Sequence, residues 1–171
     1  MNRLVLAELD PRPGERVLEI GFGGGGLLAA LLQAGARPVG VDPSRAMVER
    51  ARWRLGGRVE LAEASAEALP LADASVDKAA SVNSIYFWPQ PEAAVAELAR
   101  VVRTGGRVAI AFEPPEELRK WPGHRFGFRL WEEEEVRAHL AGSGFGRFQV
   151  VEGRGRKPDR FLCLTAERLE G

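Results

Sequence analysis

The sequence predicts an α/β fold, a single domain in which a mostly parallel sheet is covered by helices on both faces. Short runs of apolar, β-prone residues alternate with longer segments of helical periodicity between residues 16 and 112. A glycine cluster, residues 21–26, stands between the first such run and the first such segment. Strands that alternate with helices form parallel sheets through right-handed crossovers.

The composition is that of one globular domain. The 171 residues suit one domain with a proper core, and hydrophobic and charged residues make up 45% and 28% of them. Basic and acidic residues number 24 each, so neither net charge nor a basic block predicts nucleic-acid binding. No apolar run reaches the ~20 residues of a membrane span, which predicts a cytoplasmic location without membrane contact. Cys163 is expected in the core, and no Cys/His spacing predicts a metal site.

The glycine cluster has the form of a nucleotide-binding turn. Apolar residues within 17–20 predict a strand, and leucines within 27–32 recur at helical spacing. Glycine between them permits positive φ and close approach of a ligand, and the first amides of the helix point at that ligand. Starting at Gly21, the cluster fits G-x-G-x-x-G of dinucleotide folds through Gly26 and G-x-G-x-G of S-adenosylmethionine enzymes through Gly25. The turn alone leaves both cofactors open.

Asp42, the acid that ends the second expected strand, is the second feature that indicates a nucleotide-binding site. It follows Gly21 by 21 positions. A carboxylate at the tip of the second strand of a strand–helix–strand unit lies beside the ribose of a nucleotide bound at the first turn. Alternatively, Asp42 or Ser44 caps the helix expected over 45–55. The spacing favours ribose binding.

The remaining elements follow from periodicity and from helix breakers. Strands are expected over residues 17–20, 38–42, 59–62, 79–82, 107–112, 145–151 and 161–165. Helices are expected over residues 2–9, 27–34, 45–55, 91–103 and 132–141. The segment 114–131 is rich in aromatic residues, proline and glycine without periodicity, which is typical of a lid or a binding loop.

Four motifs, taken together and in order, resemble those of class I S-adenosylmethionine-dependent methyltransferases, of the small-molecule, type 11-like group. They are Val17-Leu-Glu-Ile-Gly-Phe-Gly-Gly-Gly25, Val41-Asp-Pro-Ser-Arg-Ala-Met47, Ala64-Ser-Ala-Glu-Ala-Leu-Pro70 with Ser75-Val-Asp77, and Glu97-Leu-Ala-Arg-Val-Val-Arg-Thr-Gly-Gly-Arg107. Each is weak alone, and their joint occurrence over nearly the whole chain is specific.

The resemblance implies a single Rossmann-like domain across residues 1–171. Its central, mostly parallel seven-stranded sheet has helices on both faces and an antiparallel final strand. The segment 114–131 is expected to be an insertion that covers the acceptor. The implied activity is transfer of a methyl group from S-adenosylmethionine to a small-molecule acceptor by in-line displacement, which leaves S-adenosylhomocysteine. The sequence identifies neither the acceptor nor the oligomeric state.

The resemblance also assigns residues to the cofactor. Glu19, two positions before the first glycine, would organise the loop and bind the cofactor's amino group, often through water. Asp42 would bind the ribose hydroxyls. The backbone at Gly21, Gly23 and Gly25 would lie along the methionine and ribose parts.

Further positions would surround the adenine and the methionine end. Pro43 and Met47 match positions that pack on adenine. Ser65 stands where many relatives have an Asp that binds the adenine amino group, so the Ala66 amide is expected to contribute to adenine recognition instead. Asn83, at the end of the fourth strand, would face the methionine end.

Methyl transfer needs chiefly a well-positioned nucleophile, so a dedicated catalytic side chain is not required. If the acceptor must lose a proton, the candidates for a general base are His124, Glu113 and Tyr86. Each has a simpler interpretation: His124 as a hydrogen-bonding group of a loop, Glu113 as a charge at the end of a strand, and Tyr86 as a packing residue. The acceptor pocket is expected to be lined by residues 86–88 and closed by three aromatic residues, Trp121, Phe126 and Phe128.

Two other functions fit parts of the pattern. A methyltransferase-like cofactor-binding module without activity is suggested by the short N-terminal helix and by Ser65. A nicotinamide-dependent oxidoreductase fits the formal G-x-G-x-x-G match, but the chain lacks a Tyr/Lys pair because Tyr86 is its only tyrosine. Asn83 is not followed by the Pro-Pro-aromatic sequence of enzymes that methylate base amines, which disfavours a nucleic-acid substrate.

Overall fold

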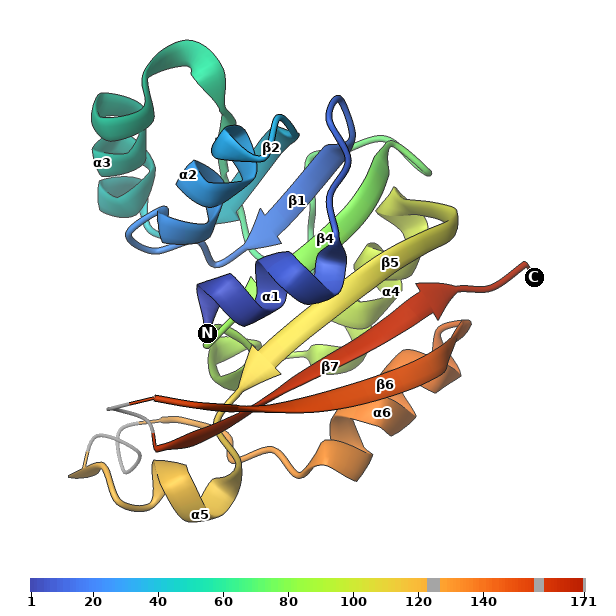
Figure 1. The fold of residues 1–171 in the computed structure, drawn as a ribbon. Helices are drawn as coiled ribbons and strands as arrows, with labels where there is room; N and C mark the ends of the chain where they lie inside the picture. Colours follow the sequence, from blue (N-terminus) through green and yellow to red (C-terminus); the bar gives the residue numbers. More distant parts are fainter. Residues whose placement is uncertain (123–126, 156–158, 171) are drawn as a thin grey trace.

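Seven strands form one sheet in the order β3-β2-β1-β4-β5-β7-β6 in the computed structural model, which describes residues 1–122, 127–155 and 159–170 (Figure 1). The strands are β1 (Arg16–Ile20), β2 (Arg37–Asp42), β3 (Glu60–Glu63), β4 (Val76–Val82), β5 (Val102–Phe112), β6 (Phe145–Arg154) and β7 (Arg160–Arg168). Strand β7 is antiparallel to both of its neighbours, and the other pairs are parallel. The predicted fold class is confirmed.

Helices cover both faces of this sheet, as predicted (Figure 1). The helices are α1 (Asn2–Leu9), α2 (Gly26–Gln33), α3 (Arg45–Leu55), α4 (Pro91–Val101), α5 (Pro115–Leu118) and α6 (Glu133–Gly142), with short 3-10 turns η1 (Gly56–Arg58) and η2 (Ile85–Phe87). Helices α1 to α3 pack in two clusters on one side, and α4 and α6 share the large cluster on the other side. Among the described residues, no helix has the length and apolar character to cross a bilayer.

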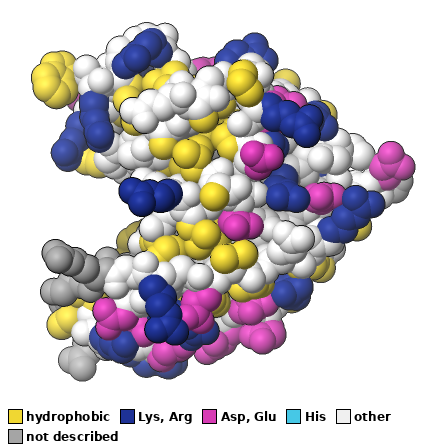
Figure 2. All heavy atoms as spheres, in the orientation of Figure 1, with side chains coloured by type: hydrophobic (Ala, Val, Ile, Leu, Met, Phe, Trp, Pro, Cys, Tyr) yellow, Lys and Arg dark blue, Asp and Glu magenta, His cyan; other side chains and the backbone are white. Residues whose placement is uncertain are grey.

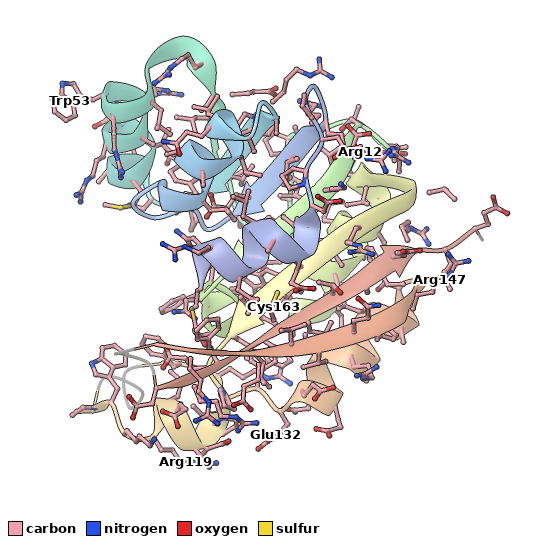
Figure 3. The ribbon with its side chains drawn as sticks, viewed as in Figure 1. Arg12, Trp53, Arg119, Glu132, Arg147 and Cys163 are labelled. Atoms are coloured by element: carbon pink, nitrogen blue, oxygen red, sulfur yellow. The ribbon has the colours of Figure 1, made fainter. Side chains whose placement is uncertain are left out.

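Helix α1 lies flat on the sheet because the strands beneath it carry small side chains. Val5 and Leu9 of α1 are fully buried against Ala80, Ala109 and Cys163, and the thiol lies under the helix in Figure 3. Full burial of each large apolar side chain contributes roughly 1.5–3 kcal/mol. This contact fixes the start of the chain beside the carboxyl ends of β1 and β4.

The expected boundary between the helix at 91–103 and the strand at 107–112 is wrong. The helix ends at Val101, and β5 begins at Val102, which pairs with Val76 before an irregularity in the register. Gly106 has no room for a side chain, because a Cβ there would lie 2.6 Å from the Asp77 carbonyl oxygen. The glycines therefore belong to the strand and do not end the helix.

The sheet reverses its order between β1 and β4. From β1 the chain proceeds outward to β2 and β3, and then crosses to β4 on the other side. At such a switch point the loops after adjacent strands diverge and leave a crevice at the carboxyl ends. The fold therefore places the glycine turn after β1, Asp42 at the end of β2 and Asn83 after β4 around one crevice.

Candidate cofactor and acceptor site

A cavity of about 760 Å³ lies at the carboxyl ends of β1, β2 and β4. Figure 2 shows the molecule hollowed on this side, between the part that carries α2 and α3 and the part that carries α5. The volume is within the range of small-molecule sites. The cavity wall contains most of the predicted cofactor residues, namely Glu19, Gly21, Gly23, Asp42, Pro43, Ser65, Ala66 and Asn83.

The first glycine of the turn is required by a close approach. Gly21 has φ 69°, and a Cβ built on it would lie 2.3 Å from the Cβ of Ser84. The Ser84 hydroxyl donates a hydrogen bond to the Ile20 carbonyl at 2.9 Å and shares another with the Ser81 hydroxyl at 2.7 Å. Ser84, which was not among the predicted site residues, thus joins the end of β4 to the turn after β1. No sequence signal identifies it, because serine is common after strands.

Asp42 holds the glycine turn through the backbone. Its Oδ2 accepts a hydrogen bond from the Gly23 amide and its Oδ1 one from the Ser44 amide, both at 2.9 Å. Ser44 is the N-cap of α3 but makes no side-chain cap. Each carboxylate oxygen has further acceptor capacity, so the side chain can also accept from ribose hydroxyls. Of the two predicted roles, helix capping is replaced by a hold on the Gly23 amide and on the Ser44 amide just before α3, and ribose binding stays a prediction.

Glu19 is a buried acid with an unsatisfied oxygen. The residue is only 3% exposed, and its Oε2 has no hydrogen-bond partner among the described residues. Burial raises the pKa of Glu19 to about 8; the Leu28 backbone amide lowers it, and the charge of Asp42 raises it. An unpaired buried carboxyl group is costly, and such groups occur preferentially at functional sites. The oxygen is suited to a ligand that brings a positively charged donor.

Two predicted cofactor residues do not reach the cavity wall. Gly25 has φ 70° at the start of α2, and a Cβ there would face Leu55 of α3 at 3.5 Å. Met47 packs against the cluster that contains Phe22 and Val48. Their roles toward a cofactor remain predictions.

Two residues of the cavity wall, on α1 and α3, were not predicted from the sequence. Asn2 and Arg54 both line the wall. The Arg54 guanidinium donates to the Gly24 carbonyl at 2.6 Å, and the Asn2 amide lies 2.7 Å from where a Cβ of Gly26 would be. They could not be found from sequence, because they approach the turn only after α1 and α3 pack on α2.

A small polar network lies beside the cavity at the end of β4. Asn83 has φ 53°, an unusual value for a residue with a side chain. The Tyr86 hydroxyl donates to the Asn83 amide oxygen at 3.2 Å and accepts from the Glu113 backbone N–H. The Asn83 amide nitrogen donates to the Glu113 carboxylate at 3.4 Å. The three residues close a ring of hydrogen bonds that fixes the Asn83 side chain at the cavity wall.

The candidates for a general base differ in their place relative to this network. Burial raises the pKa of Tyr86, and its hydroxyl is engaged on both sides. Burial also raises the pKa of Glu113, although the Asn83 hydrogen bond opposes the shift. Neither residue contributes to the cavity wall directly. His124 lies outside the described residues, as does Phe126.

Aromatic side chains gather next to the same network. Phe87 and Trp88 line the cavity, whereas Tyr86 is buried behind them. The Phe128 ring lies 4.5 Å from that of Phe87, 5.1 Å from that of Trp121 and 5.8 Å from that of Tyr86, measured between ring centroids. Phe87 and Trp121 are still 57% and 51% exposed. Four aromatic side chains thus form one cluster, which we call the aromatic patch: Tyr86, Phe87, Trp121 and Phe128.

Across the described residues, no group of three or more His, Cys, Asp and Glu side chains has the arrangement to hold a metal ion. The polar groups of the cavity are carboxylates, backbone amides and hydroxyls, together with Arg54 and the amides of Asn2 and Asn83. Such groups suit an organic ligand that carries hydroxyls and a positive charge.

Comparison with known proteins identifies the family. A model of the methyltransferase domain matches residues 18–110. The uncharacterized methyltransferase YdaC of Bacillus subtilis is 27% identical over 98% of this chain and 91% of its own length. An uncharacterized methyltransferase of Mycobacterium tuberculosis is 38% identical, but the match covers 66% of this chain and 46% of that protein. The chain thus spans less than half the length of several curated relatives that it matches.

Solved structures share the whole fold. An S-adenosylmethionine-dependent methyltransferase of Thermotoga maritima, described as a possible histamine N-methyltransferase, superposes with a TM-score of 0.83 at 26% identity, over 98% of this chain and 87% of that one. A proposed methyltransferase of Haloferax volcanii, in complex with the Trm112 methyltransferase activator, has a TM-score of 0.90 at 20% identity, over 98% and 88%. This chain belongs to the methyltransferase domain family and has the fold of class I S-adenosylmethionine-dependent methyltransferases.

Proposed function

We propose that the chain transfers a methyl group from S-adenosylmethionine to a small-molecule acceptor. The observation that carries the proposal is the unpartnered Glu19 carboxyl oxygen, buried in the wall of a cavity that Asp42 and the glycine turn also form. The cofactor has an ammonium group and two ribose hydroxyls, which match an unsatisfied acid and a second acid with spare acceptor capacity.

The charge of the cavity supports a cationic cofactor. Its wall contains three acidic side chains, Glu19, Asp42 and Glu67. Arg54 is the single basic side chain among the described residues of the wall, and it is bound to the Gly24 carbonyl. Acidic side chains thus outnumber basic ones in the wall, and Glu19, whose raised pKa of about 8 leaves it protonated near neutral pH, can release its proton when an ammonium group binds beside it. S-adenosylmethionine carries positive charge on both its ammonium and its sulfonium groups.

The protein's contribution to the reaction is positioning. When bound, the cofactor supplies an electrophilic methyl group that a nucleophile takes by in-line displacement. Glu19 and Asp42 would hold its two ends, Pro43 and Ala66 would flank the adenine, and Asn83 would mark the methionine end. Effective molarities for well-aligned groups show that orientation alone supplies much of such an acceleration. Glu113, which does not line the cavity, remains a candidate to take a proton through a bridging water.

The small-molecule acceptor is placed, in this proposal, against the aromatic patch, with the segment 114–131 as its cover. The described cavity opens beside Phe87 and Trp88, and the balanced charge of 24 basic and 24 acidic residues gives no footprint for nucleic acid. We propose that the protein acts as a soluble enzyme in the cytoplasm.

Calorimetric titration with S-adenosylhomocysteine, S-adenosylmethionine and NAD tests the cofactor. We expect saturable binding of the first two and none of NAD; no binding at ligand concentrations on the order of millimolar would contradict the proposal, and binding of NAD alone would favour an oxidoreductase. Incubation with methyl-labelled cofactor and cell extract then tests transfer. A labelled small product supports the enzyme, whereas tight cofactor binding without any product favours the inactive binding module.

A further inference from the structure

We infer that the exposed side of residues 45–58, which we call the α3 surface, docks on an anionic lipid bilayer with Trp53 at the level of the headgroups. Docking of this kind is independent of which acceptor is methylated. Two observations carry the inference: a tryptophan that the fold leaves in solvent, and a local excess of arginines that have no carboxylate partner among the described residues.

Trp53 is not part of the core. It is 89% exposed, more than any other large hydrophobic side chain of the described residues, and it projects from α3 away from the molecule (Figure 3). The buried face of α3 is formed by Val48, Ala51 and Leu55. Packing within the fold therefore does not account for the tryptophan. Its ring is apolar and its indole N–H is polar, and such side chains concentrate at membrane–water interfaces.

The arginines around Trp53 give the α3 surface a positive charge. Residues 45–58 contain five arginines and one acid, although the charge of the whole chain is balanced. All five arginines are exposed. Four of them bind no carboxylate among the described residues, and three of these four donate only to backbone carbonyls: Arg50, and then Arg52, Arg54 and Arg58. These guanidinium groups are available to an anionic partner.

The acids nearby do not neutralise this charge. Glu49, the one acid of the segment, is paired with Arg45 at 2.9 Å. On the neighbouring strand β3, Glu60 is paired with Arg16 at 2.7 Å. Glu63 is close enough to raise the pKa of Arg45, together with Glu49. The nearby acids thus act on Arg45 and Arg16, and the four other arginines of the α3 surface keep an excess of positive charge.

The shape and composition of the α3 surface favour a bilayer over other polyanions. Helix α3 lies at the outer edge of the molecule (Figure 1), so its exposed side is a ridge. Single-stranded nucleic acids bind in basic grooves with successive aromatic rings, and a protein interface has an apolar core. The α3 surface offers one large ring, and the exposed residues around it are mainly arginine and glycine.

A bilayer needs neither a groove nor a second apolar residue. Arginine pairs well with phosphate groups, and basic residues close to an anionic leaflet are attracted to it. Tryptophan adds an anchor at the interface. The sequence predicts no membrane contact because it has no apolar run long enough to span a bilayer, but a peripheral contact of this kind does not need one.

Cosedimentation with lipid vesicles tests the inference. The probes are vesicles of phosphatidylcholine alone and vesicles that also contain about 30% phosphatidylglycerol, which is anionic. We expect at least about tenfold tighter binding to the anionic vesicles, and loss of this binding as salt rises from about 0.05 to 0.5 M. The tryptophan emission should shift to shorter wavelength on binding. Absence of binding to the anionic vesicles, or equal binding to both kinds, would overturn the inference.

A double variant with a charge-matched control assigns the binding to the α3 surface. Arg50→Gln with Arg52→Gln should weaken binding to the anionic vesicles about 25-fold, because each arginine near the surface contributes about fivefold. Arg12→Gln with Arg119→Gln lowers the net charge equally, at exposed positions in other parts of the molecule (Figure 3), and should bind as the wild type does. Arg54 stays unchanged, because it also lines the cavity. Equal affinities of the two double variants would contradict docking through α3.

The tryptophan is tested by its own emission. Trp53→Leu should weaken vesicle binding severalfold and abolish the emission shift, whereas Trp121→Leu, at a side chain that is 51% exposed, should retain both. An emission shift that persists in Trp53→Leu would overturn the inference. Tight binding of a labelled oligouridylate by a wild type that does not bind vesicles would assign the α3 surface to nucleic acid instead. S-adenosylhomocysteine affinity, measured on the same variants, tests the proposed function separately.

Discussion

The two ends of the cavity are built in different ways. At the cofactor end, backbone bonds fix the geometry: the Gly21 amide donates to the Val41 carbonyl at 2.7 Å, and Asp42 accepts from the Gly23 amide. At the acceptor end, side chains from distant segments meet, as when Phe128 packs on Phe87. The first end is built from residues close together in the sequence, whereas the second depends on how Trp121 and Phe128 pack against Phe87 of η2.

Under the proposed function, this difference would allow one fold to keep its cofactor and change its acceptor. Backbone bonds in a glycine turn tolerate few substitutions, because Gly21 leaves no space for a Cβ. The aromatic patch contains ring contacts between partly exposed side chains such as Trp121, and we expect substitutions there to leave the sheet intact. We therefore expect changes at the cofactor end to affect folding and cofactor binding together, and changes at the acceptor end to affect specificity.

The largest effect is expected for Gly21→Ala. The added methyl would overlap Ser84, and the residue would have to keep a positive φ, so we expect a loss of about 4 kcal/mol in the free energy of unfolding. Urea unfolding followed by circular dichroism measures it. Gly24→Ala is the matched control, because a Cβ there meets nothing within 4 Å. Failure of Ser84→Gly to restore part of the loss in a double variant would contradict the overlap.

The second effect concerns Glu19 and pH. Its pKa in the folded protein is about 8, above the ordinary value of 4.5, so the native state holds a proton that the unfolded chain releases between these values. The stability from this group is present at low pH and is lost as pH rises through about 8. Glu19→Gln should remove this decline and stabilise the ligand-free protein above pH 8 by a few kcal/mol, because each pKa unit corresponds to about 1.4 kcal/mol.

Thermal unfolding of the wild type and of Glu19→Gln from pH 5 to 9 measures this difference. Glu97→Gln is a contrasting control, because the pKa of Glu97 is lowered by its hydrogen bond with Arg100. Parallel pH profiles for the wild type and Glu19→Gln would show that the buried acid is not protonated. The same substitution should weaken S-adenosylhomocysteine binding, because a neutral amide replaces the group that would face the ammonium.

An intermediate effect is expected for Asp42→Ala. The change removes a predicted ribose acceptor and leaves the Gly23 and Ser44 amides without their partner, so cofactor affinity should fall by about 2–3 kcal/mol. Equilibrium dialysis with labelled S-adenosylhomocysteine measures the change. Glu63→Ala, an exposed acid at the end of the neighbouring strand β3, should bind normally. Unchanged affinity in Asp42→Ala would assign Asp42 to the turn alone.

The smallest effect is expected for Tyr86→Phe at the acceptor end. It removes the hydroxyl that joins Asn83 to the Glu113 amide, which should cost about 1–2 kcal/mol of stability. S-adenosylhomocysteine affinity should stay within about twofold of the wild type, a difference well below 1 kcal/mol. A large loss of cofactor affinity would show that the two ends of the cavity are not separate.

Most residues predicted to bind the cofactor lie around one cavity, because the features that predict them are close together along the chain. A strand, a glycine turn and an acid after the next strand form a local unit, and the structure places Glu19, Gly21 and Asp42 around one cavity. The sequence did not predict Ser84, Asn2 or Arg54, because their contacts with the turn join segments that are far apart in sequence.

The acceptor end could be predicted only in outline. Aromatic residues were expected to line it. Phe87 and Trp88 do line the cavity, and Phe128 packs against Phe87. The sequence does not reveal which aromatic rings stay exposed. It also does not reveal that the Tyr86 hydroxyl is hydrogen-bonded to the Glu113 backbone. These properties depend on the irregular path of the chain after β5, for which no periodicity exists.

The central claim is that this cavity holds S-adenosylmethionine between Glu19 and Asp42. A crystal structure of the protein with S-adenosylhomocysteine tests it most directly. We predict the amino group within hydrogen-bonding reach of the Glu19 carboxylate, directly or through one water, and the ribose hydroxyls on Asp42. Electron density for the ligand elsewhere, or in this cavity with its amino group away from Glu19 and its ribose away from Asp42, would contradict the account.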